Sequence, residues 1–271
     1  MQQIEHASVF LKIFHDVANR GTHVAPRGQR VIEIENYCYE IPPYVRFQSF
    51  DCRKLNLSYI KHEFLWYLRG DKFDLSILEK AKIWKDIVNQ DGSLNSNYGQ
   101  YIFGADNQFD NVVRILRDDK DSRRASISFL NKEHLFSDTR DVPCTYTINF
   151  RIRQDKLNMS VHMRSQDLIY GMANDCPAFS FVHEMMLNVL KQYYPNLEYG
   201  MYHHVCDSLH VYERHFKMLE QLTSGEAKYI PVDCPKISGA DEVMYLRKMH
   251  ESNLKPNDVP ENCRFARWLL T

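Results

Sequence analysis

Residues 141–175 read DVPCTYTINFRIRQDKLNMSVHMRSQDLIYGMAND and decide the fold. Two segments of this stretch alternate between apolar and polar residues with a period of two, which is typical of β-strands. In the first segment the even positions from Cys144 to Ile152 fall on one face. In the second, the apolar residues occupy the odd positions of 157–164. We therefore expect a β-hairpin at the centre of the fold.

The hairpin predicts the surroundings of one cysteine. A two-residue turn is expected at Gln154–Asp155. Counting back from it places Cys144 opposite Ser165 and beside Arg164, within side-chain reach. A nearby guanidinium lowers the pKa of a thiol and increases its thiolate fraction, which is the setting of a nucleophile. The alternative is that Cys144, one of seven cysteines, is simply a small buried residue.

Length and charge restrict the class of protein. The 271 residues can bury a sizeable core, and a formal net charge of −1 does not favour binding to nucleic acid or an acidic membrane surface. The opening residues lack the basic and apolar regions of a signal peptide, and no run is apolar enough to cross a bilayer. We therefore expect a cytoplasmic protein that binds neither membranes nor nucleic acid directly.

The cysteines and histidines predict no metal site and no disulfide framework. The seven cysteines are odd in number and widely scattered, and no pair has CxxC spacing. His203 and His204 are adjacent on a strand-like segment and so point to opposite faces, which argues against a shared metal. A reducing compartment fits this use of cysteine.

The rest of the chain alternates helical and strand-like segments without a repeat or a clear interdomain linker. Asn56 and Gly70 are typical of the first and last positions around a helix. One mixed α/β domain over residues 1–271 is the simplest interpretation. The expected helices lie at 7–19, 57–70, 81–88, 109–119 and 177–194, and the expected strands lie at 31–41, within 121–130 and within 202–216, besides the hairpin.

Three arginines in polar turns are candidates for binding a phosphate. Arg27 stands beside a glycine, and Arg123 and Arg124 are adjacent on a turn. Guanidinium groups bind phosphate through paired hydrogen bonds. The alternative in each case is an ordinary solvated charge.

Other polar residues sit where a ligand could meet them. Glu63 lies next to the apolar stripe of the 57–70 helix, so it either reaches solvent or is held in a site with a shifted pKa. His210 and Tyr212 are two residues apart on a strand-like run, so both face the same side and could hydrogen-bond a ligand hydroxyl.

Several motifs, taken in this order, resemble those of the thymidylate synthase family. They are HEFLWYLRGD (62–71), IWKDIVNQDGSLNSNYG (83–99), DSRR (121–124), PC (143–144), MRSQD (163–167), Gly171 and DSLHVYERH (207–215). The resemblance covers about residues 8–220, and the tail over 217–271 does not match clearly. It implies a thymidylate synthase-like α/β (α+β) fold, with a large mixed β-sheet packed with helices and a homodimer formed through the sheet.

The resemblance also implies roles for individual residues. Cys144 looks like the nucleophile that adds to C6 of a pyrimidine, which lets C5 attack the one-carbon unit of the cosubstrate methylenetetrahydrofolate. Glu63 looks like the carboxylate that organises water and proton transfers, and its apolar flank would raise its pKa. The other implied roles are base and folate contacts for Trp84, Tyr98 and Asp167, same-subunit phosphate ligands for Arg27, Arg164 and Ser165, phosphate ligands donated by a partner subunit for Arg123 and Arg124, and ribose contacts for His210 and Tyr212.

Two departures from the synthases point to a different substrate. Asp175 stands where synthases carry Asn, and a carboxyl group can accept from the 4-amino group of cytosine. When protonated it can also donate to N3; the alternative is that N3 itself carries the proton. The alternative is that Asp175 is an ordinary acid at the start of a helix led by Pro177. Thr145 replaces the synthases' histidine. The run NSNYG (95–99), DSRR (121–124), CT (144–145), MRS (163–165), ND (174–175) and SLHVY (208–212) resembles the phage-type deoxycytidylate hydroxymethylases of the family.

That similarity implies the conversion of dCMP, methylenetetrahydrofolate and water to 5-hydroxymethyl-dCMP and tetrahydrofolate. Such a nucleotide would serve modified phage DNA, made in the host cytoplasm, or a nucleoside antibiotic pathway. Three alternatives remain open at this point: a dCMP methylase that ends with hydride transfer, a hydroxymethylase acting on CMP, and a nucleotide-binding module that has lost catalysis.

Overall fold

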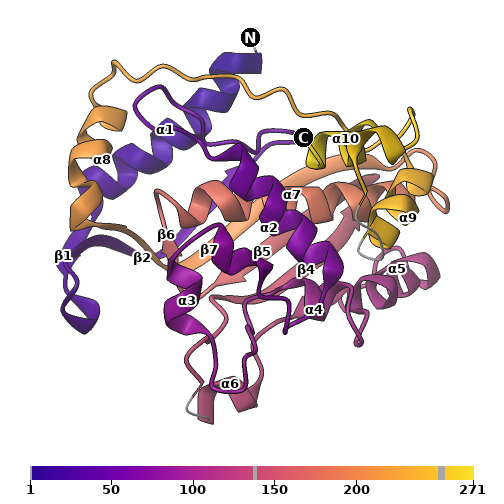
Figure 1. Cartoon of the computed structure of the whole chain (residues 1–271). Coiled ribbons are helices and arrows are strands. Elements are labelled where there is room, and N and C mark those ends of the chain that lie inside the picture. The colour runs from indigo at the N-terminus through magenta and orange to yellow at the C-terminus, as the bar shows by residue number, and fades with distance from the viewer. Residues whose placement is uncertain (1, 137–138, 250–253) are drawn as a thin grey trace.

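A mixed seven-stranded β-sheet forms the centre of the computed structural model, which describes residues 2–136, 139–249 and 254–271 (Figure 1). The strand order is β1-β2-β7-β5-β4-β3, with β6 also paired to β7. β7 pairs in parallel with β5 and β6, and every other pairing of these strands is antiparallel. The strands are β1 Thr22–Val24, β2 Val31–Ile41, β3 Ser126–Ser128, β4 Thr145–Arg153, β5 Lys156–Met163, β6 Gln166–Asp167 and β7 Glu198–Tyr212.

Helices cover one face of this sheet. α1 packs on β2, α5 on β3 and β4, and α7 on β7, while α2 packs on α7 (Figure 1). The helices are α1 Gln2–Arg20, α2 Leu57–Arg69, α3 Ile83–Ile87, α4 Gly99–Ile102, α5 Gln108–Asp118, α6 Lys132–Phe136, α7 Gly171–Leu190, α8 Phe216–Thr223, α9 Ala240–Lys248 and α10 Arg264–Leu269. The helices expected at 7–19, 57–70, 81–88 and 109–119 and the strand expected at 31–41 are confirmed, with ends that differ by a few residues.

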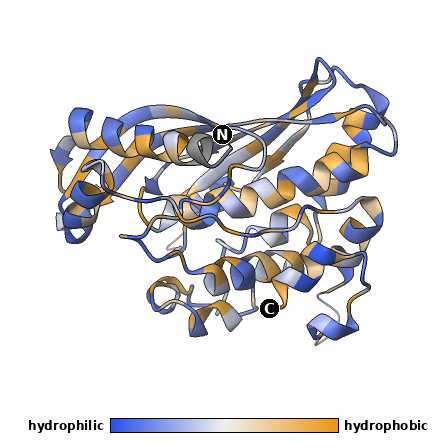
Figure 2. Cartoon of the chain, turned by 90° about the horizontal axis from the view of Figure 1, so that it is seen from above, coloured by the Kyte–Doolittle hydropathy of each residue, from blue (hydrophilic) through white to orange (hydrophobic). Residues whose placement is uncertain are grey.

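The opposite face of the sheet is half exposed in the single chain. From Tyr199 to Asp207 of β7, buried residues at even positions alternate with partly exposed residues at odd ones. On the exposed face, Nε2 of His162 on β5 lies 2.7 Å from Oδ1 of Asp207 on β7. Figure 2 shows hydrophilic and hydrophobic residues interleaved along the strands. Within the described residues, the helices are all too short or too polar to cross a membrane.

The central hairpin forms with the predicted turn. Arg153 faces Lys156 across it, and Gln154 and Asp155 have φ of 51° and 53°. Positive φ at both central residues is the geometry of a tight turn whose twist matches that of the two strands. The turn therefore sets the register of β4 against β5 over most of their length.

The predicted register fails by one residue at the end of the hairpin that carries Cys144. A β-bulge between Thr145 and Thr147 inserts an extra residue into β4. As a result the N–H of Arg164, rather than Ser165, lies opposite Cys144, and it donates a 2.8 Å hydrogen bond to the carbonyl oxygen of Cys144.

The bulge also changes which side chains face the core. The alternation predicted Tyr146 on the same face as Ile148, but Tyr146 is partly exposed and its ring lies 5.1 Å from that of His162, on the open face. Thr145 takes the buried position instead, with a fully buried side chain. The period of two predicts the strand correctly but does not reveal where an extra residue interrupts it.

The helix predicted from Pro177 begins six residues earlier, at Gly171, and ends at Leu190. Pro177 therefore lies inside α7, where it supplies no N–H to the helix and disfavours the regular geometry. Burial outweighs this cost, because α7 is buried along most of its length against the sheet, α2 and α9. Asp175 consequently lies within α7, and its interpretation as an acid at the start of a helix is wrong.

Candidate active site

Cys144 immediately precedes β4 and is held by Arg164, which immediately follows β5. Besides the backbone hydrogen bond, the Arg164 guanidinium donates from Nε to the carbonyl of Pro143 at 3.0 Å and from Nη2 to that of Val142 at 2.8 Å. Burial raises the pKa of the Cys144 thiol, and Arg164 and Arg27 oppose that rise. The predicted proximity of the cysteine and Arg164 is thus confirmed, although the thiol remains largely protonated until a base removes its proton.

Tyr98 reaches the backbone next to the nucleophile. Its hydroxyl oxygen accepts a 3.2 Å hydrogen bond from the N–H of Thr145, and its side chain is buried. Its ring stacks on that of Phe179 of α7, with centroids 6.0 Å apart. Tyr98 therefore joins the loop before α4 to both β4 and α7.

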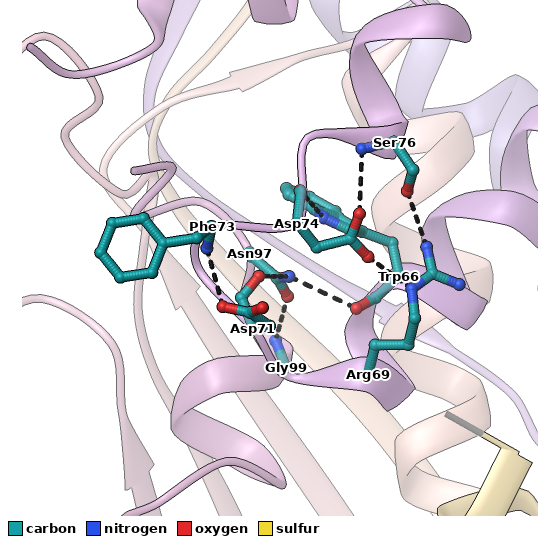
Figure 3. A network of polar contacts seen from close by, with 8 residues as sticks. All are labelled: Trp66, Arg69, Asp71, Phe73, Asp74, Ser76, Asn97 and Gly99. Atoms are coloured by element: carbon teal, nitrogen blue, oxygen red, sulfur yellow. Dashed lines mark hydrogen bonds and ion pairs between the residues drawn. The ribbon is translucent and has the colours of Figure 1, made fainter. Parts of the chain in front are cut away.

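A polar network fixes that loop against α2 (Figure 3). The Asn97 amide donates to the carbonyls of Trp66 and Asp71, at 3.3 and 2.9 Å, and accepts from the N–H of Gly99 at 3.1 Å. Gly99 is required by a close approach, because a Cβ there would lie 1.7 Å from the carbonyl oxygen of Tyr67. The Asn-Tyr-Gly sequence thereby places Tyr98 between two packed helices.

Helix α2 presents Glu63 to the same region. The helix begins at the predicted cap Asn56, whose side chain accepts from the N–H of Tyr59, and ends at Gly70 with φ of 61°. Glu63 is only 5% exposed, and its Oε1 accepts a 2.8 Å hydrogen bond from the Tyr59 hydroxyl. The Trp84 indole N–H donates to that hydroxyl in turn, at 2.9 Å.

The Glu63 carboxyl holds its proton at neutral pH. Burial, with a further contribution from the nearby carboxyl of Asp175, raises its pKa to about 8, and the Tyr59 hydrogen bond only partly opposes this. Glu63 is therefore suited to giving up and taking back a proton, and the alternative that it reaches solvent is wrong.

Asp175 of α7 lies near enough to Glu63 to raise the pKa of that carboxyl. Burial raises its pKa to about 7, and a hydrogen bond from Gln166 Nε2 to its Oδ2, at 3.0 Å, opposes the rise. Two carboxyl groups that share a buried region cannot both ionise easily, so at least one of Glu63 and Asp175 carries a proton near neutrality. The arrangement can both donate a hydrogen bond to a ring nitrogen and accept one from an amino group.

The ends of β6 and β7 gather a second group of predicted residues. Asp167 pairs with His210 in the ladder, and the rings of His210 and Tyr212 lie 5.0 Å apart. The Asp167 carboxylate accepts from the N–H groups of Ile169 and Tyr170, at 3.2 and 3.1 Å, so it also shapes the turn into α7.

Arg27 and Ser165 complete this end of the site. Arg27 lies in the exposed turn between β1 and β2, with φ of 52°. The positive charge of Arg27 opposes the rise in pKa that burial causes at Cys144 and Tyr212, which places Arg27 near both residues. Ser165, half buried, immediately follows Arg164.

Arg123 and Arg124 do not reach this region in the single chain. Both are exposed, and β3, which follows them, pairs with the middle of β4 so that Ser126 faces Asn149. Because the strands are antiparallel, the two arginines lie toward the turn end of the hairpin, far from Cys144.

Sequence reasoning missed Gln166 and Tyr59, the residues that hydrogen-bond the carboxyls of Asp175 and Glu63, respectively. Gln166 stood inside the quoted MRSQD motif, and Tyr59 lies one helical turn before Glu63. The spacing of Tyr59 and Glu63 was a usable signal, because side chains four residues apart on a helix are neighbours.

The family model for thymidylate synthase matches residues 8–252. The chain belongs to the thymidylate synthase family. The match extends beyond the region over which the motifs are recognisable, and includes α8 and α9.

Phage hydroxymethyltransferases are among its similar relatives. The deoxycytidylate 5-hydroxymethyltransferases of enterobacteria phages T6 and T2 are each 32% identical over 200 residues, which is 70% of this chain and 81% of the relative. The deoxyuridylate hydroxymethyltransferase of Bacillus phage SP01 is 30% identical over 221 residues, which is 75% of this chain and 56% of the relative. Family and relatives together support a folate-dependent one-carbon transferase.

Proposed function

We propose that the protein converts dCMP, methylenetetrahydrofolate and water to 5-hydroxymethyl-dCMP and tetrahydrofolate. The observation that carries this proposal is the position of Asp175, a half-buried carboxyl group with a raised pKa near Glu63 and Cys144. A protonated carboxyl presents cytosine with both the donor and the acceptor that its N3 and 4-amino groups need. The T6 and T2 relatives point to the same substrate.

In this proposal the chain's own residues divide the chemistry. The Cys144 thiolate adds to C6 of the base, while Glu63 gives up and takes back protons and is held in place by the Tyr59 hydroxyl, which Trp84 orients in turn. Tyr98 stands beside the nucleophile, next to the C5 side of a base bonded to it. C5 then attacks the one-carbon unit, and loss of the C5 proton expels tetrahydrofolate and leaves an exocyclic methylene. Water adds to that methylene, and the Cys144–C6 bond breaks to restore the C5–C6 double bond. Tetrahydrofolate therefore leaves without being oxidised.

The remaining residues are proposed to bind the nucleotide and the folate. The 5′-phosphate lies against Arg27, Arg164 and Ser165, together with Arg123 and Arg124 of a second subunit. The ribose meets His210 and Tyr212. The folate lies near Trp84, Asp167 and Glu63. The half-exposed sheet face is the proposed dimer interface, and residues 1–271 act as one catalytic unit.

One incubation tests base, sugar and product together. The protein is supplied with methylenetetrahydrofolate and with dCMP, dUMP or CMP in parallel, and products are identified by mass. A hydroxymethyl group gained on dCMP alone is expected. A methyl group with dihydrofolate would indicate a methylase, reaction with CMP would change the sugar assignment, and reaction with dUMP alone would refute the role of Asp175. No reaction at all would indicate a binding module.

A further inference from the structure

A buried chain of hydrogen bonds runs from Asp175 away from the site. The Gln166 amide donates to Asp175 Oδ2 at 3.0 Å, and its Oε1 accepts from the Tyr39 hydroxyl at 2.8 Å. Gln166 is 2% and Tyr39 is 7% exposed. The three side chains come from α7, β6 and β2, so the fold and not local sequence brings them together.

We propose that Gln166 and Tyr39 are positioning residues that determine which oxygen of Asp175 faces the base, and thereby the preference for cytosine over uracil. This inference rests on the proposed function, because it explains how the same carboxyl reads the base.

The two ends of the Gln166 amide are chemically different, and Tyr39 decides their orientation. A tyrosine hydroxyl that donates must meet the amide oxygen, which leaves the NH2 end facing Asp175. The Asp175 Oδ2 atom then accepts a hydrogen bond from this NH2 group. It cannot also carry a proton that points at Gln166, because two donors would face each other. When Asp175 is neutral, its proton must therefore reside on Oδ1.

The Oδ1 atom is the one available to a ligand, because it makes no hydrogen bond with the residues that the structure describes. An Oδ1–H group can donate to the N3 of cytosine, which is an acceptor. The N3 of uracil carries a hydrogen, so two donors would face each other there. A buried mismatch of this kind discriminates strongly between substrates. Burial and the negative charge of Asp167 raise the pKa of Asp175 to about 7, so this carboxyl is protonated over part of the neutral range.

Tyr39 is itself held in place by packing. Its ring stacks on that of His204, with centroids 4.7 Å apart and planes 7° apart, and His204 Nδ1 hydrogen-bonds the Tyr202 hydroxyl at 2.7 Å. The Tyr39 hydroxyl also lies 3.8 Å from Cys176 Sγ. A rigid ring fixes the hydroxyl, so the orientation of the amide is imposed by the sheet behind the site.

Loss of the Tyr39 hydroxyl removes the reason for that orientation. In Tyr39→Phe the amide can rotate and present Oε1 to Asp175, which then must carry its proton on Oδ2. Oδ1 becomes an acceptor, which suits the N3–H of uracil. Gln166→Met, which keeps the length of the side chain but lacks the amide, leaves Asp175 without its fixed donor.

The test compares both variants with the wild-type protein and with Tyr37→Phe. Tyr37 lies on the same strand, but its hydroxyl donates to Asp16 at 2.6 Å, so this variant is a matched control. The ratio of kcat/KM for dCMP to that for dUMP should fall at least about tenfold in Tyr39→Phe and Gln166→Met, and stay unchanged in the control.

The pH profile separates positioning from a general loss of structure. Gln166 donates to the ionised form of Asp175, so its removal should raise the pKa of that carboxyl and move the alkaline limb of dCMP turnover to higher pH. A merely misfolded site would lower turnover of both nucleotides without moving that limb. Unchanged ratios and an unchanged limb in both variants would overturn the inference.

A binding experiment distinguishes this inference from the proposed reaction. Calorimetric titration of dCMP and dUMP against pH requires no turnover. If the wild-type protein makes no product but prefers dCMP, and Tyr39→Phe reduces that preference, the reaction assignment fails while the inference stands. If the preference is the same in Tyr39→Phe, Gln166→Met and wild type, the inference fails whatever the reaction is.

Discussion

The guanidinium of Arg164 donates two hydrogen bonds to the segment that leads into Cys144, and its backbone N–H donates a third to the carbonyl of Cys144 itself. The same side chain opposes the rise that burial causes in the thiol pKa. Arg164 thus holds the nucleophile's backbone and adjusts its acidity, and these two effects can be separated from phosphate binding by experiment.

Arg164→Ala should slow alkylation of Cys144 by iodoacetamide near neutral pH. The thiol loses the cation that favours its thiolate, and its backbone loses two charge-assisted hydrogen bonds. A misplaced nucleophile should also reduce kcat by on the order of 100-fold. Alkylation rates measured against pH, with the labelled cysteine identified by peptide mass, report the first effect without substrate.

Arg151→Ala is the control for this prediction. Arg151 lies on the same hairpin, but it is exposed and hydrogen-bonds only Ser160 Oγ among the described residues, at 3.3 Å. Its loss should leave alkylation of Cys144 unchanged. Equal rates for Arg164→Ala and wild type would mean that the guanidinium does not influence the thiol.

Asp175→Asn should shift the substrate preference from dCMP toward dUMP. An amide donates and accepts as uracil requires, and it has no carboxyl proton for the N3 of cytosine. The ratio of the two kcat/KM values should change by on the order of 100-fold or more. Asp155→Asn, in the exposed hairpin turn, should leave the ratio unaltered, whereas an unaltered ratio in Asp175→Asn would refute base recognition by this carboxyl.

The hairpin shows how far sequence alone could predict the site. The turn at Gln154–Asp155 and the alternation of both strands placed Cys144 close to Arg164, because short-range pairing follows from periodicity and turn length. The one-residue shift at Cys144 could not be predicted, because a bulge adds a residue without altering the alternation on either side of it.

Contacts between distant elements account for what was missed. Pro177 is a strong local signal for a helix start, but α7 begins earlier because the burial of its first turns outweighs that preference. Gln166 meets Tyr39 across 127 positions of sequence. No local pattern specifies such a pair, whereas Glu63 stood out because it adjoined an apolar stripe on a well-capped helix.

Glu63→Gln should make stability less dependent on pH. The pKa of Glu63 rises from an ordinary 4.5 to about 8 on folding. The folded state therefore holds a proton that the unfolded chain has released, so stability present below pH 4.5 is lost as pH rises toward 8. Glutamine does not titrate, so Glu63→Gln should not show this loss of unfolding free energy. At ~1.4 kcal/mol per pKa unit, the loss in the wild-type protein is at most about 5 kcal/mol.

Urea unfolding at about pH 5 and about pH 9 measures this difference directly. The wild-type protein should lose more unfolding free energy between the two conditions than Glu63→Gln does. Glu79→Gln changes an exposed carboxylate in the segment after α2 and should behave like wild type. If Glu63→Gln also follows the wild-type pH dependence, the Glu63 carboxyl is not protonated in the folded protein.

Mixed subunits test whether the arginines before β3 act across a dimer. Arg123 and Arg124 lie far from Cys144 of their own chain, and the open sheet face offers a surface for a second copy. Cys144→Ser and Arg124→Ala proteins should each be nearly inactive alone. After the two are unfolded together and refolded in equal amounts, half of the dimers contain both, and each of these has one site with an intact Cys144 and an intact Arg124. Activity should then recover to about a quarter of the wild-type value.

Arg114→Ala mixed with Cys144→Ser is the control, because Arg114 is on α5 and the Arg114→Ala protein should be active before mixing. If the first mixture stays inactive although sedimentation shows mixed dimers, Arg124 does not complete the partner's site.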